Sequence, residues 1–209
     1  MSHRSRLNQG FTIIELLVSI GIVAVILTVV ISNQSVYTDN IALTNLADDI
    51  GLTISQTQAY GIGVKELSPG SSNFNASFGV TLSLLGSGSN SAYLSFADRN
   101  GNEVYDGDWS CPIGGVSECL RKIMISRGNY IDELCRIRNN PNNPYQCNIG
   151  RIDISFTRPS LEARIKFFNQ GGNPIDDDPD FIGARVSVRS PGGAGRSILI
   201  YYTGQISVQ

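Results

Sequence analysis

Histidine is nearly absent from this chain of 209 residues, since the only one is His3. Imidazole is the commonest general base near neutral pH and a frequent metal ligand, so its scarcity excludes most histidine-dependent hydrolase and metal-site arrangements. The sequence also lacks the glycine-rich loops that bind dinucleotides or nucleoside triphosphates. We therefore expect a protein that is not an enzyme.

A basic tract is missing as well. The chain has 16 lysines and arginines against 18 aspartates and glutamates, for a net charge of −2 at pH 7. Nucleic-acid-binding domains usually carry clustered cations on one face or along one helix, and the arginines here are scattered. We expect no nucleic-acid partner.

The four cysteines contain no Cys-x-x-Cys pair, which argues against a structural zinc site. They are Cys111, Cys119, Cys135 and Cys147. An even number fits an exported domain with disulfide bonds, and three pairings are open. We favour Cys111–Cys119 with Cys135–Cys147, because each bond then closes a short local loop. The alternative is that all four remain reduced thiols.

Proline is absent from Phe11 up to Pro69, which permits one long helix. Residues 11–31 contain a single charge, Glu15, and as a helix they are about 30 Å long, the thickness of a hydrocarbon core. Residues 32–62 form an exported amphipathic half, whose apolar residues recur at helical spacing: Val36, Leu43, Leu46, Ile50 and Ile54. We predict a helix from about Phe11 to Tyr60.

The segment before this helix, residues 1–10, is a short polar leader that ends in Gly10. An ordinary secretory signal is cut after its apolar stretch, whereas a cut at Gly10 would leave the apolar helix on the mature protein. Arg4 and Arg6 favour a cytoplasmic position for the leader and export of the rest. A plain signal anchor is the alternative.

A polar leader ending in Gly10, Phe11 opening an apolar helix and Glu15 close behind it resemble the N-terminus of the type IV pilin superfamily, the pilins and the pseudopilins of type II secretion. The resemblance implies that a prepilin peptidase cuts after Gly10 and that the new amine of Phe11 is methylated. It implies that Glu15 pairs with this amine, in its own or a neighbouring subunit, during assembly.

The same resemblance implies a location and partners. The protein would cross the inner (cytoplasmic) membrane once with its head exported, and would then join other pilins or pseudopilins in a filament. Whether that filament is a pilus, a secretion pseudopilus or a competence filament stays open.

Residues 63–209 change to short runs rich in β-branched and aromatic residues, separated by glycine turns. We therefore predict an α+β fold, in which the long N-terminal helix packs on an antiparallel β head of two small sheets. The expected strands are 78–85, 92–97, 120–126, 151–157, 163–168, 184–188 and 197–202, with 206–208 as a last edge strand.

Three stretches of the head resemble the H-type minor pseudopilins and related minor pilins: LSFADRNGNEVYDGD, DISFTRPSLEARIKF and RSILIYYTGQISV. The resemblance implies a structural minor pilin or pseudopilin. Residues 127–150, which carry the last two cysteines, depart from the family pattern as an insertion, and we expect residues 136–146 within it to be loop-like. The alternative function is therefore a filament-tip adhesin or substrate-binding module that uses this insertion.

Oxygen-bearing side chains alternate within one eleven-residue stretch: Asp98, Asn100, Asn102, Asp106 and Asp108. Such side chains on a turn can converge on Ca²⁺, which takes 6–8 oxygen ligands, although the EF-hand spacing does not fit. The alternative is a hairpin turn whose Asx side chains bond to the backbone. We expect no other cofactor.

Overall fold

The computed structural model of the chain describes residues 11–63, 66, 76–112 and 117–209, without the side chains of residues 32, 33, 35 and 36. The leader Met1–Gly10, with its predicted cut after Gly10, and the side chain of Val36 lie outside these residues. The contacts divide the chain into two units, Met1–Thr38 and Asp39–Gln209, and each is described by itself.

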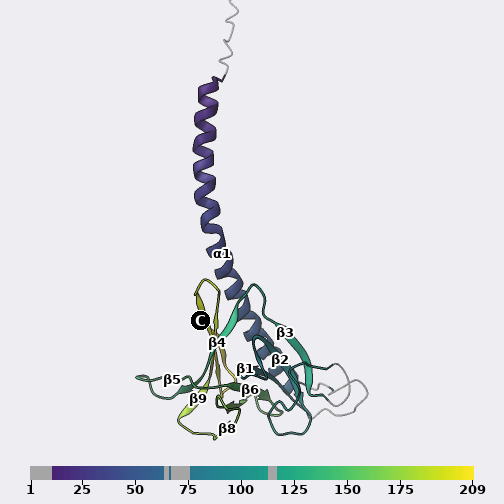
Figure 1. Cartoon of the computed structure of the whole chain (residues 1–209). Coiled ribbons are helices and arrows are strands. Elements are labelled where there is room, and N and C mark those ends of the chain that lie inside the picture. The colour runs from purple at the N-terminus through teal and green to yellow at the C-terminus, as the bar shows by residue number, and fades with distance from the viewer. Residues whose placement is uncertain (1–10, 64–65, 67–75, 113–116) are drawn as a thin grey trace, which may run out of the picture. The chain divides into compact units, whose positions relative to one another are not determined.

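One helix, α1 (Ile13–Ile62), runs through both units (Figure 1). In the second unit its apolar stripe is buried as predicted: Leu43, Leu46, Ile50 and Ile54 are 0–8% exposed. The helix ends at a close approach to the sheet. A Cβ added to Gly61 would lie 2.3 Å from the carbonyl oxygen of Phe156, so a larger residue does not fit there.

Eleven strands in two antiparallel sheets make up the described part of the head. The first sheet has the order β3-β2-β1-β6-β7-β8. Its strands are β1 (Ser77–Ser83), β2 (Ser89–Asp98), β3 (Cys119–Met124), β6 (Arg151–Phe156), β7 (Ala163–Phe168) and β8 (Pro174–Ile175).

The second sheet has the order β11-β10-β9-β4-β5. Its strands are β4 (Tyr130–Arg138), β5 (Tyr145–Gln146), β9 (Phe181–Arg189), β10 (Gly195–Tyr201) and β11 (Ile206–Val208). The predicted α+β fold, with a long N-terminal helix and two antiparallel sheets, is confirmed.

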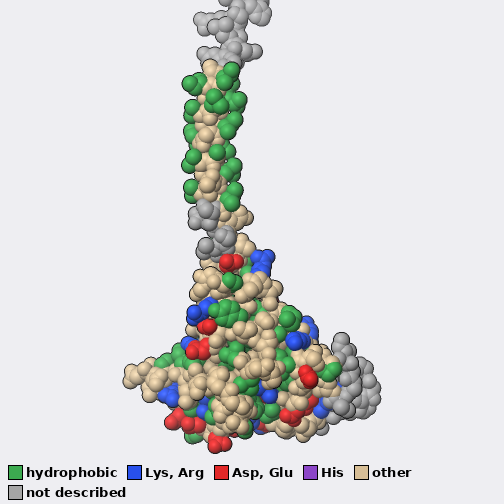
Figure 2. Space-filling model, in the orientation of Figure 1, with side chains coloured by type: hydrophobic (Ala, Val, Ile, Leu, Met, Phe, Trp, Pro, Cys, Tyr) green, Lys and Arg blue, Asp and Glu red, His purple; other side chains and the backbone are tan. Residues whose placement is uncertain are grey.

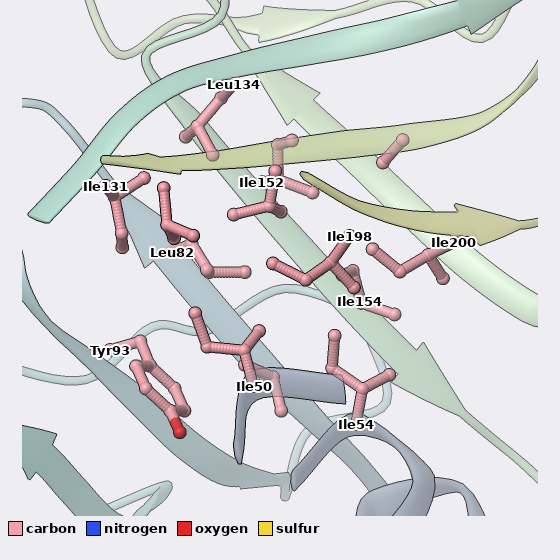
Figure 3. Close-up of a cluster of buried hydrophobic side chains, with 14 of the residues drawn as sticks. Ile50, Ile54, Leu82, Tyr93, Ile131, Leu134, Ile152, Ile154, Ile198 and Ile200 are labelled. Atoms are coloured by element: carbon pink, nitrogen blue, oxygen red, sulfur yellow. The ribbon is translucent and has the colours of Figure 1, made fainter. Parts of the chain in front are cut away.

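Both sheets contribute to one hydrophobic core with the second half of α1. Figure 3 shows Ile50 and Ile54 of the helix facing side chains from both sheets. The first sheet supplies Leu82, Tyr93, Ile152 and Ile154, and the second supplies Ile131, Leu134, Ile198 and Ile200. The hydroxyl of Tyr93 also lies 3.2 Å from that of Thr53, which joins helix and sheet by a buried hydrogen bond.

The other face of the first sheet is covered by the segment between β2 and β3. Tyr105 of this segment packs with Leu94 and Phe96 of β2, and Trp109 lies against them. This cover explains why Asp153 of β6 is as buried as its apolar neighbours Ile152 and Ile154. Successive side chains of β6 therefore point to two faces of the sheet that are both buried, rather than to a buried and a solvent-exposed face.

The loop-like interpretation of residues 136–146 is wrong at both ends, which belong to strands, and no strand was predicted in the wider segment 127–150. This segment contains β4, a nine-residue strand that pairs with β9 on one side and β5 on the other. Four consecutive residues of β4, from Leu134 to Ile137, are buried. Because β4 completes the second sheet, the segment is part of the fold rather than an addition to it.

Candidate functional site

The first turn of α1 is closed by Thr12 and Glu15. The Oγ1 of Thr12 accepts a hydrogen bond from the N–H of Glu15 at 3.3 Å, and Glu15 Oε2 accepts from the Thr12 hydroxyl at 3.2 Å and from its N–H at 3.4 Å. This reciprocal arrangement is a capping box. The pattern Thr-x-x-Glu ahead of an apolar run is the sequence signal of such a cap.

The apolar side chains in the first part of α1 are exposed. Residues Ile13–Ile31 have a mean hydropathy of 2.8 and are long and apolar enough to cross a membrane. Their large apolar side chains are 52–80% exposed, and Figure 2 shows them along the visible face of the helix. An exposed apolar surface of this extent marks a site of contact with lipid or protein.

Polar side chains in this segment bond to the helix itself. Ser19 donates to the carbonyl of Glu15 at 2.7 Å, and Thr28 donates to that of Ala24 at 2.8 Å. Internal hydrogen bonds of this kind reduce the cost of placing hydroxyl groups in hydrocarbon. Glu15 is thus the one ionisable group among the described residues of the candidate span.

A protein-family model described as the prokaryotic N-terminal methylation motif matches residues 5–31. The chain carries a prepilin-type methylation motif. This match supports a protein of the type IV pilin and pseudopilin class, whose members are typically structural, and implies processing by a prepilin peptidase. No curated protein and no solved structure matches the chain.

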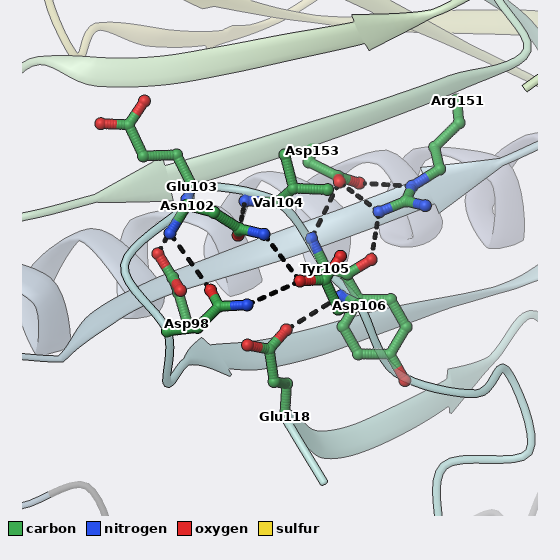
Figure 4. A network of polar contacts seen from close by, with 10 residues as sticks. Asp98, Asn102, Glu103, Val104, Tyr105, Asp106, Glu118, Arg151 and Asp153 are labelled. Carbon is green, nitrogen blue, oxygen red and sulfur yellow. Dashed lines mark hydrogen bonds and ion pairs between the residues drawn. The ribbon is translucent and has the colours of Figure 1, made fainter. Parts of the chain in front are cut away.

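In the β head, the acidic loop is organised by the buried carboxylate of Asp98, which is 2% exposed. Its Oδ1 accepts from the N–H of Gly101 at 2.7 Å. Figure 4 shows the second bond, in which its Oδ2 accepts from the N–H of Glu103 at 2.9 Å. Both residues have positive φ, which such a turn requires. Asp98 therefore fixes the backbone of the loop.

The other candidate calcium ligands also bond within the loop. Asp106 Oδ2 accepts from the side-chain amides of Asn100 at 2.7 Å and Asn102 at 2.6 Å. The side-chain oxygens of these asparagines accept from the N–H groups of Asn102 and Val104, and Asp108 accepts from Ser110. Amide N–H groups thus face Asp106, as in an Asx turn.

Two carboxylates outside the predicted set anchor this loop. Glu118, 6% exposed, accepts from the N–H groups of Arg99 at 3.1 Å and Asp106 at 2.9 Å. Asp153 accepts from the N–H of Tyr105 at 3.0 Å and pairs with Arg151 (Figure 4). Burial raises the pKa of Asp153, and the adjacent guanidinium opposes this rise. Both roles depend on contacts distant in sequence, so no local motif could have indicated them.

The structure contains two disulfide bonds, Cys111–Cys119 and Cys135–Cys147. These are the pairs that the sequence analysis favours. The first lies beside the cluster of Leu94, Phe96 and Tyr105, and the second joins β4 to the residue that follows β5. Glu133 comes within 4.8 Å of Cys135 and Cys147, but a bonded pair of sulfurs offers no thiolate to a metal ion.

Proposed function

We propose that this protein is a minor pilin or pseudopilin: a structural subunit that a prepilin peptidase processes, the inner membrane holds, and a type IV pilus or type II secretion pseudopilus incorporates. The observation that carries the proposal is the methylation motif at residues 5–31, whose part from Ile13 onward is a helix with exposed apolar side chains. The β head of the H-type resemblance is compatible with this role.

The apolar segment supplies the means of assembly. When the segment leaves lipid for a bundle of similar helices, it moves between two apolar media. Assembly and disassembly are therefore both energetically accessible. Gly21 favours close approach, since an added Cβ would meet no heavy atom within 4 Å. A neighbouring helix can pack at this position without displacing a side chain of the same chain.

Glu15 gains a new partner when the leader is removed. Before the cut, the nitrogen of Phe11 is an uncharged amide, and Glu15 bonds only to Thr12 among the side chains described. The cut at Gly10 creates an ammonium on Phe11, one helical turn from Glu15. An unpaired charge in a membrane helix costs about 2.5–3.5 kcal/mol on insertion scales, so pairing within or between subunits stabilises the mature protein.

The processing step is tested by expressing the full gene with its prepilin peptidase and measuring the mass and N-terminal sequence of the membrane-extracted product. We expect a start at Phe11 with one added methyl group. A start at Met1, or a cut after Ile31, would refute the proposed class of function.

Assembly is tested with two variants of the capping box. Glu15→Ala removes the charge and the cap, whereas Thr12→Ala removes the hydroxyl of the cap and leaves the charge. We expect both to be processed, and only Glu15→Ala to be lost from sheared filaments on immunoblots. Equal loss of both variants would assign Glu15 to helix capping alone, and normal incorporation of Glu15→Ala would contradict the pairing role.

The alternative function, an adhesin or substrate-binding module, needs a narrower test than deletion of residues 127–150, because that deletion removes β4. The exposed turn at residues 139–143 can be replaced by a short glycine linker without touching either strand. Loss of surface or substrate binding with normal filament assembly would favour the alternative.

A further inference from the structure

The disulfide between Cys135 and Cys147 lies against a guanidinium group. Nη2 of Arg185 is 3.2 Å from Cys135 Sγ and 3.6 Å from Cys147 Sγ. The same nitrogen donates to Glu133 Oε2 at 2.6 Å. The ring of Tyr145 stacks on the guanidinium at 4.0 Å, which holds the cation against the two sulfurs.

The two sulfurs differ in access. Cys135 is fully buried in β4, whereas Cys147 is half-buried just after β5. A reductant from solvent therefore reaches Cys147 first. The sulfur nearer to Arg185 is the one that would then leave with the electron pair.

The other disulfide has a different environment. Cys111 and Cys119 pack against an apolar and aromatic cluster that includes Trp109. Among the described residues, no arginine or lysine bonds to either of these sulfurs. In the described part of the chain, a cation therefore bonds to one disulfide and not to the other, and the second disulfide serves as an internal reference.

We propose that Cys135–Cys147 is a thiol–disulfide exchange site for a dithiol reductant of the exported compartment, with Cys147 the sulfur attacked and Cys135 the leaving sulfur held by Arg185. A thiolate of the reductant attacks Cys147 Sγ. The S–S bond breaks and its electron pair leaves on Cys135 as a thiolate, which the guanidinium stabilises.

The second thiol of the same reductant completes the reaction. Its second thiolate attacks the mixed disulfide and displaces Cys147, so the dithiol is oxidised by two electrons and both cysteines are reduced. The protons of the dithiol pass to solvent or to the released cysteines. Reduction removes the disulfide cross-link between β4 and the residue that follows β5, the outer strand of its sheet.

Glu133 moderates this chemistry. Its carboxylate shares Nη2 of Arg185 with the sulfurs and lies 3.3 Å from Cys135 Sγ, where it opposes a thiolate. Removal of the two charges should therefore change the rate in opposite directions. Arg185→Gln should slow reduction and Glu133→Gln should speed it.

The experiment uses the full-length chain in detergent with dithiothreitol as the reductant. Samples are quenched with iodoacetamide over time and digested with trypsin, which places Cys135 in peptide 128–136, Cys147 in 139–151, and the other two cysteines together in 100–121. Arg189→Gln is the matched control. Like Arg185, Arg189 lies on β9 and forms an ion pair with a carboxylate of β4, that of Asp132, at 2.9 Å.

We expect Arg185→Gln to slow reduction of Cys135–Cys147 by about three- to tenfold, from a one- to two-unit change in leaving-group pKa. Glu133→Gln should accelerate it, and Arg189→Gln should leave it unchanged. Cys111–Cys119 should keep its rate in all variants. An unchanged or faster rate in Arg185→Gln would overturn the proposal, since faster reduction indicates that Arg185 only holds the strands together.

The order of attack has its own readout. Brief exposure to reduced glutathione followed by acid quenching traps the mixed disulfide. Glutathione is expected on peptide 139–151, and its appearance on peptide 128–136 would refute the assignment of Cys147 as the attacked sulfur.

Discussion

Replacing Asp98 by alanine tests how the acidic loop is held. The variant removes two hydrogen bonds from backbone N–H groups, at 2.7 Å and 2.9 Å, to a charged acceptor that is 2% exposed. Each such bond contributes about 1.5–3 kcal/mol. The N–H of exposed Gly101 regains water after the change, so we expect a net loss of about 2–4 kcal/mol in the free energy of unfolding.

The assay is thermal unfolding of the full chain in detergent, followed by fluorescence of its single tryptophan. That residue is Trp109, which packs at the loop and so reports on it directly. For a domain of this size the expected fall in Tm is about 4–16 °C. The control is Asp108→Ala, which removes an exposed carboxylate that accepts a hydrogen bond from the N–H of Ser110. Equal effects of the two variants would refute the role assigned to Asp98.

Calcium separates the two interpretations of this loop. An Asx turn predicts that millimolar Ca²⁺ leaves the Tm of the wild type unchanged, because the Asp98 oxygens are used by the backbone and the asparagine amides face Asp106. A cation site predicts a rise that grows with concentration. A rise that disappears in Asp106→Asn would overturn the turn interpretation.

Two further predictions concern stability. Ile50→Ala in the buried stripe of α1 should cost about 2–5 kcal/mol in denaturant unfolding, and Leu52→Ala, at a position 57% exposed, should cost much less; equal costs would place the core elsewhere. Burial, with the charges of Asp108 and Glu118, raises the pKa of Tyr105 to about 12. The folded state therefore keeps a proton that the unfolded state loses, and stability should fall as pH rises from about 10 to about 12. Tyr105→Phe should flatten this fall when unfolding is measured across that range, whereas an unchanged slope would show that other groups cause it.

The helix was the most predictable element because one local pattern decides it. Proline is absent and apolar residues recur at helical spacing, and the stripe from Leu43 to Ile54 is buried accordingly. Most strands were predicted correctly for a similar reason, because short runs of β-branched residues are separated by glycine turns. Their sheet order depends on distant pairings, such as β1 with β6, which no local pattern encodes.

Strand β4 was missed because its sequence hides the alternation. Its pairing with β9 shifts register between Ile131 and Glu133, which places an irregularity where the period should be clearest. Arg136 is 4% exposed and lies over the ring of Phe181 at 3.6 Å, so a charged residue occupies a core position. Burial lowers its pKa. From the sequence alone an arginine is expected at the surface, so Arg136 interrupts the apolar pattern that would have indicated the strand.

The capping box gives the proposed processing step a physical consequence. In the proposed precursor, Thr12 bonds to Glu15, and Arg4 and Arg6 of the leader would favour a cytoplasmic position of the N-terminus. A cut after Gly10 removes these two arginines and creates one ammonium beside Glu15. Glu15 and this ammonium can then form a pair with no net charge, which lowers the cost of placing this end of the helix in an apolar bundle. Processing would therefore permit assembly by creating a cation that pairs with Glu15. Thr12→Ala keeps the carboxylate of this pair and Glu15→Ala removes it, so the two variants must behave differently.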